Sequence, residues 1–119
     1  SKGYTALHYT IKFMYNRLTD LLLKHGANCD AVTKEYESLL HTAILTANEE
    51  RYHYRACHQT IFMLIKHGCP LNILYIYDNR TVTPFQLAVI QNQLTVAKML
   101  YQAGCDITSL EDVTEICKD

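Results

Sequence analysis

Tryptophan is absent from this 119-residue chain, and glycine and proline are scarce, with four and two residues. No apolar run approaches the roughly 18–20 residues that a membrane-spanning helix requires. Basic and acidic side chains nearly balance, at 11 and 12, for a net charge of −1. We therefore expect no insertion into a membrane, and the charge gives no reason to expect nucleic acid as a partner.

The motifs of common catalytic chemistry are missing as well. The sequence has no Gly-rich phosphate loop, no Gly-x-Ser-x-Gly turn around a nucleophile and no His-Glu-x-x-His metal motif. None of the six histidines is paired with a nucleophile by any recognisable motif. We expect no catalytic residue, no cofactor and no metal ion, and so no enzyme.

The cysteines number five, and no charged-then-apolar leader precedes them. An odd count without a secretory leader favours reduced thiols in a cytoplasmic or nuclear protein. Cys69 and Cys105 each follow a glycine directly, where a small buried side chain is suitable, so we interpret them as packing residues.

A short phrase recurs three times along the chain. Its versions are Thr5–His8, Ser38–His41 and Thr83–Gln86, and each is followed by an apolar run and a glycine, namely Gly26, Gly68 and Gly104. The glycine lies nineteen residues after the third position of the phrase in the first and last versions, and 28 in the middle one. Recurrence at fixed internal spacing indicates a repeat architecture.

The phrase resembles the Thr-Pro-Leu-His opening of the ankyrin repeat. The resemblance implies an all-α repeat solenoid of helix-turn-helix pairs joined by β-hairpins. We place one domain over 1–119, with repeats near 3–31, 34–72 and 79–108 and a capping helix at 109–118. The resemblance also implies that the side chains of His8 and His41 form hydrogen bonds with the backbone of neighbouring turns.

Two insertions interrupt the repeats. Nine extra residues fall within 47–57, which lacks Gly and Pro, so we expect longer helices around a displaced turn, with Asn48 capping the second helix. The second hairpin, after Asn72, is three residues longer than the first at 30–37, and Asp78-Asn79 is its expected turn.

His53, Cys57 and His58 lie close together in the first insertion. His53 and Cys57 would share one face of a helix, but a structural zinc needs four ligands and the sequence offers no second pair. We therefore prefer a solvated, partly packed helix to a metal site.

Four of the nine tyrosines fall in the insertions, two of them beside arginines. Tyr and Arg often dominate protein interfaces. The candidate partner-binding residues are Arg51, Tyr52, Tyr54, Arg55, Tyr75 and Tyr77. The alternative is that these rings only cover the inserted backbone.

The resemblance implies a non-enzymatic protein-binding module, a scaffold or adaptor fragment that contacts another protein through hairpin tips and the concave helix surface. One alternative is the substrate receptor of a cullin-type ubiquitin ligase, in which a SOCS box follows the repeats; another is an array attached to an enzyme or channel. Because no capping element precedes the first repeat, we expect that repeat to expose apolar surface and the chain to be part of a longer protein.

Overall fold

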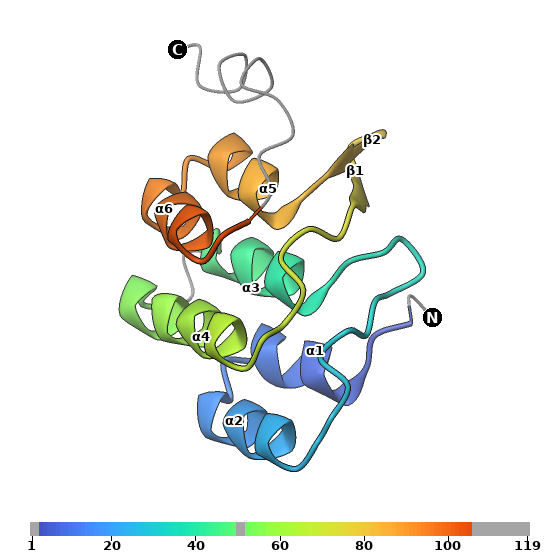
Figure 1. Ribbon diagram of the computed structural model, residues 1–119, viewed down its shortest axis with the longest axis vertical. Helices are drawn as coiled ribbons and strands as arrows, with labels where there is room; N and C mark the ends of the chain where they lie inside the picture. The colour runs from blue at the N-terminus through green and yellow to red at the C-terminus, as the bar shows by residue number, and fades with distance from the viewer. Residues whose placement is uncertain (1–2, 50–51, 106–119) are drawn as a thin grey trace.

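Three helix pairs stack along the long axis of the computed structural model, which describes residues 3–49 and 52–105 (Figure 1). The pairs are α1 (Ala6–Lys12) with α2 (Asn16–Lys24), α3 (Leu39–Ala47) with α4 (Tyr54–Lys66), and α5 (Pro84–Ile90) with α6 (Leu94–Gln102). One layer contains α1, α3 and α5, and the other contains α2, α4 and α6. The chain therefore has the expected all-α repeat fold.

Each recurring phrase proves to be the start of a helix. The hydroxyls of the cap residues Thr5, Ser38 and Thr83 accept the amide of the residue three positions later, and that residue's side chain accepts the cap amide in return. In the second repeat, the Ser38 amide donates to His41 Nδ1 at 3.2 Å. This reciprocal bonding satisfies two amides that a helix start would otherwise leave unpaired.

The glycine of each repeat ends its second helix. Gly26, Gly68 and Gly104 have φ values of 87°, 79° and 94°, a left-handed conformation that glycine adopts without steric cost. The turn between the two helices of a pair also uses positive φ. Met14 has φ 62° in the first pair, and Asn92 has φ 58° in the third.

The core lies between the two helix layers and between successive pairs. Five residues at equivalent positions of the three repeats are buried in it, namely Leu7, Leu40, Leu64, Phe85 and Leu100. Leu22 is only half-buried, because no helix pair of residues 3–49 and 52–105 covers the outer side of the first pair. Cys69 and Cys105 pack in this core as predicted, and no disulfide joins the cysteines of the described ranges.

Two buried imidazoles connect successive repeats. His8 and His41 are fully buried, and Nε2 of each lies 3.0 Å from a backbone carbonyl of the next repeat, that of Glu37 or Val82. A carbonyl only accepts, so Nε2 carries the proton and Nδ1 accepts the amide of the helix cap. The expected bonding to neighbouring turns is confirmed. Burial lowers the pKa of both imidazoles, and that of His41 to about 4.

The first insertion lengthens both helices of the second pair, as expected. Helix α3 has nine residues where α1 has seven, and α4 has 13 where α2 has nine. The expected start of α4 was wrong, however. Asn48 is the C-cap of α3, and α4 begins at Tyr54 after His53, whose Nδ1 accepts the Arg55 amide.

The two connections between repeats differ. The second contains a hairpin of β1 (Tyr75–Tyr77) and β2 (Arg80–Val82). The first was also expected to be a hairpin, but no strand is assigned to it within the described part; it is a tight turn in which the Thr33 amide donates to the Glu37 carbonyl at 3.1 Å. Tyr36 takes the positive φ, 67°, that this turn requires. The predicted capping helix at 109–118 lies outside the described residues.

The buried imidazole of His41 predicts a pH dependence of stability. Its pKa is lower in the folded protein than in the unfolded chain, so only the unfolded chain binds a proton as the pH falls below about 6.5. The free energy of unfolding should decrease towards pH 4, with His41 contributing up to about 3 kcal/mol.

His41→Gln should flatten this dependence in urea titrations between pH 8 and pH 4. Gln is a matched replacement because Gln86 fills the same role in the third repeat, where its Oε1 accepts the Thr83 amide at 2.9 Å. A variant that kept the wild-type pH dependence would contradict the assignment of a buried, neutral imidazole.

Candidate functional site

The hairpin of the second connection projects from one side of the stack (Figure 1). Its strands pair in antiparallel register, Tyr75 opposite Val82 and Tyr77 opposite Arg80. Asp78 and Asn79 form the predicted turn, and both have positive φ, at 51° and 65°. Such a turn matches the twist of the two strands and so favours a tight hairpin.

Tyr75 holds the hairpin on the helices. Its side chain is buried, and its ring lies 5.0 Å from that of His41 and 5.8 Å from that of Tyr77. Burial raises the pKa of Tyr75 to about 12, with a smaller contribution from the carboxylates of Glu37 and Glu35. Tyr75 therefore packs inside the protein, and Tyr77 is half-buried against the same core.

The outward side of the hairpin is apolar. Leu74 and Ile76 alternate with Tyr75 along the chain, and 52% and 43% of their surfaces are exposed. The Ile76 amide donates to the Glu35 carbonyl at 2.9 Å, which joins the hairpin to the first connection. Tyr36, next to Glu35, is 54% exposed. We call Tyr36, Leu74 and Ile76 the finger patch.

The sequence prediction missed the residues of the finger patch. The three consecutive residues Tyr75, Ile76 and Tyr77 are all apolar or aromatic, so no alternation shows which of them faces inward. One available signal was the exposed turn position of Tyr36, where the family pattern has glycine.

The first insertion places a second aromatic group on α4. Tyr54 and Arg55 are exposed and Tyr52 is half-buried, while Arg51 lies outside the described residues. The Tyr54 ring stacks on His53 at 4.6 Å and meets His58 edge-on at 5.6 Å. Phe62, two turns further along α4, is 59% exposed and was not predicted.

The two sets of predicted partner-binding residues do not form one surface. The hairpin lies on the side of the stack where successive repeats are connected, whereas the insertion lies on the opposite side, where α3 turns into α4 (Figure 1). The two sets are therefore candidates for separate contacts.

The geometry of the histidine and cysteine cluster does not favour a metal site. His53 is the cap of α4 with extended backbone angles, and Cys57 is buried, so the two do not share an exposed helix face. Across residues 3–49 and 52–105, no group of three His, Cys, Asp or Glu side chains is placed to hold an ion. In the same part of the chain, no helix is both long enough and apolar enough to span a membrane.

Comparison with known families agrees with the observed geometry. The family model described as the ankyrin repeat matches residues 2–34. The first helix pair is thus an ankyrin repeat, within a chain that has an all-α repeat fold. The match covers the first helix pair, and the same capped helix starts and left-handed glycines recur in the second and third pairs. The ankyrin repeat is a non-catalytic fold whose general role is protein interaction.

The opposite orientations of Tyr75 and Ile76 predict different effects of the same substitution. Tyr75→Thr should lower the free energy of unfolding by about 2–4 kcal/mol, because it removes a buried ring. Ile76→Thr should change it by less than about 1 kcal/mol, because the side chain is exposed and Thr keeps the strand preference. Urea unfolding of both variants measures the difference, and equal losses would show that the assigned strand orientation is wrong.

Proposed function

We propose that this repeat protein is a non-enzymatic adaptor or scaffold module that binds a protein partner through the finger patch. The observation that carries the proposal is the exposure of two aliphatic side chains, Leu74 and Ile76, on a hairpin held firmly on the helices. Exposed apolar groups at a projecting element are a cost to an isolated protein and a source of affinity in a complex.

The attachment of the hairpin favours binding. Tyr75 packs on His41 and the Ile76 amide bonds the first connection, so two separate contacts limit the motion of the finger patch. A partner that covers Leu74 and Ile76 would then lose little conformational entropy in ordering them. Tyr77 shares the inward side of the strand with Tyr75 and is half-buried against the core, so we place it outside this contact.

The partner class follows from the chemistry of this patch. Its three side chains are two aliphatic groups and a phenol, with no cluster of basic residues, which suits an apolar protein surface better than a phosphate backbone. Cys29, Cys57 and Cys69 form no disulfide, which favours a location in the cytoplasm or nucleus. Tyr54 and Arg55 remain candidates for a separate contact on the far side of the stack.

The finger patch can be tested by comparing two surface variants. Leu74→Thr/Ile76→Thr removes the aliphatic groups of the finger, and Phe62→Gln removes an equally exposed ring from α4. Tagged wild type and variants are used to capture binding partners from a cell lysate, and the captured proteins are quantified by mass spectrometry. Thermal melts of the same proteins check that each variant is folded. Proteins enriched by the wild type should fall at least tenfold with the finger variant and persist with Phe62→Gln.

The opposite pattern, in which Phe62→Gln abolishes capture and the finger variant does not, would move the binding surface to α4. Unchanged capture by both variants would also contradict the proposal, provided that their melts match the wild type.

A further inference from the structure

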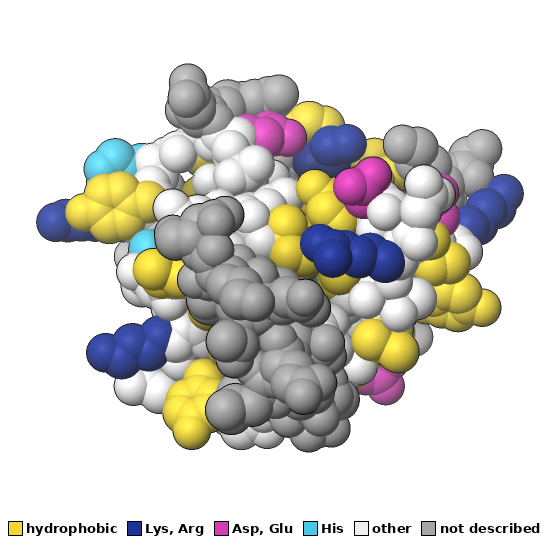
Figure 2. Space-filling view, turned by 90° about the horizontal axis from the view of Figure 1, so that it is seen from above, with side chains coloured by type: hydrophobic (Ala, Val, Ile, Leu, Met, Phe, Trp, Pro, Cys, Tyr) yellow, Lys and Arg dark blue, Asp and Glu magenta, His cyan; other side chains and the backbone are white. Residues whose placement is uncertain are grey.

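The outer side of the first helix pair is unusually apolar. Tyr9, Phe13, Tyr15 and Leu18 are between 44% and 59% exposed, and Leu22 beside them is half-buried. We call these five residues the N-terminal face. At the other end of the stack, the visible apolar side chains are interspersed with charged and polar ones (Figure 2).

For Leu18 and Tyr9, the residues at the equivalent positions of the other repeats are buried. Leu18 lies eight residues before the glycine of its repeat, as do Thr60 and Val96, and both of these are 0% exposed. Tyr9 is likewise equivalent to Thr42 and Leu87, which are 3% and 0% exposed. The N-terminal face therefore has the position of a buried interface, but the described residues do not cover it.

The contacts of the equivalent residues show what covers such a face. The Thr60 hydroxyl lies 3.2 Å from Met14 Sδ in the preceding repeat. Gln93, at the position equivalent to Tyr15, donates from Nε2 to the Ile44 carbonyl of its own preceding repeat at 2.9 Å. In both cases the side chain points back to the helix pair before it, so Tyr15 and Leu18 point to the place where another pair would lie.

The backbone before α1 has the form of a connection between repeats. Gly3, two residues before the cap Thr5, has φ 78°, and Tyr36, two residues before the cap Ser38, has φ 67°. Gly3 thus has the left-handed backbone conformation that Tyr36 has at the equivalent position of the connection between the first and second repeats.

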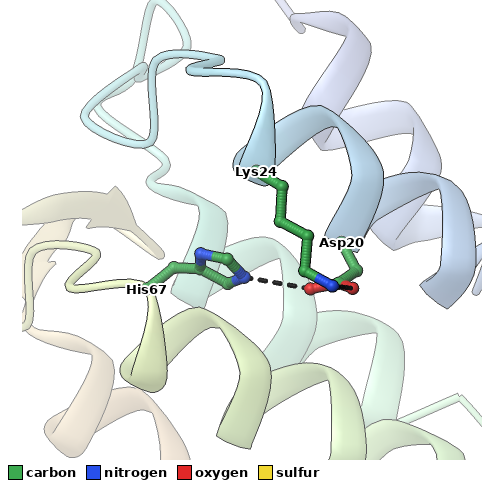
Figure 3. A network of polar contacts seen from close by, with 3 residues as sticks. All are labelled: Asp20, Lys24 and His67. Atoms are coloured by element: carbon green, nitrogen blue, oxygen red, sulfur yellow. Dashed lines mark hydrogen bonds and ion pairs between the residues drawn. The ribbon is translucent and has the colours of Figure 1, made fainter.

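A polar contact between the first two repeats indicates which side chain a preceding helix pair would need. His67, directly before Gly68, donates from Nε2 to Asp20 Oδ1 of the preceding repeat at 3.0 Å, and Lys24 lies beside the same carboxylate (Figure 3). His25 has the equivalent position in the first repeat and is exposed. A preceding pair with an acidic residue six positions before its glycine would complete the same contact.

We propose that the N-terminal face is an inter-repeat interface, and that its occupant is a further ankyrin-type helix pair joined to α1 through Gly3. Terminal repeats of a solenoid need a polar outer side for solubility, and the first repeat has the apolar side of an internal one. The proposal concerns a different surface from the finger patch and does not depend on it.

The test uses the full 119-residue chain with and without one added helix pair before Gly3. The probe is a designed ankyrin pair with small apolar residues on its packing side and Glu at the Asp20-equivalent position. A single tryptophan in it reports its unfolding separately, because the chain itself has none. Each protein is made with and without Leu18→Asp, and with Phe62→Asp as the matched control at an exposed site outside the face.

If the added pair stacks on the N-terminal face, the extended chain should unfold in urea in a single transition. Tryptophan fluorescence and circular dichroism should then give the same transition midpoint. Leu18→Asp should raise the unfolding equilibrium constant at least 100-fold in the extended chain and less than threefold in the original chain. Phe62→Asp should have the same effect in both chains.

Two separate transitions, or a Leu18→Asp effect that is equal in both chains, would overturn the proposal. A second copy of the chain could occupy the face instead, and sedimentation of the original chain tests this. A dimer that Leu18→Asp dissociates, with independent unfolding of the added pair, would assign the face to a second copy. This result would also overturn the proposal.

Discussion

The stack depends on the buried imidazole that joins one repeat to the next. His41 completes the cap of its own helix with Nδ1 and donates from Nε2 to the carbonyl of Val82, 41 residues later in the chain. Because both nitrogens are satisfied only in the neutral form, burial costs no charge and leaves no polar atom unpaired. A local signal for a helix start thus also sets the distance and orientation of the following repeat.

This constraint also positions the candidate binding surface. The ring of Tyr75 rests on the same imidazole, so the hairpin is held where the second repeat meets the third. The side of the strand that faces the imidazole is internal, and the other side carries Leu74 and Ile76 outward. The N-terminal face extends the same arrangement in the opposite direction, where the equivalent contact surface has no neighbour in the described residues.

The sequence was informative wherever a residue had one possible role. The recurring phrases and the glycines that follow them indicated the repeats correctly, because each satisfies a local backbone requirement, at a capped helix start or in a left-handed turn. The inward side of the hairpin was not predictable, because the two faces of Tyr75–Tyr77 are equally apolar and only the position of His41 decides between them. Asn48 suits either end of a helix, and the extra length of α3 placed it at the C-terminal end.

The most direct test of this account is native-state hydrogen exchange of two amides that lie outside the helices. The Ser38 amide donates to His41 Nδ1, and the Ile76 amide donates to the Glu35 carbonyl. If the imidazole joins the repeats and carries the hairpin, both amides should open with the same free energy as the α3 amides, within about 1 kcal/mol. An Ile76 amide that opens several kcal/mol more easily than α3 would show that the hairpin moves independently, and would contradict the account.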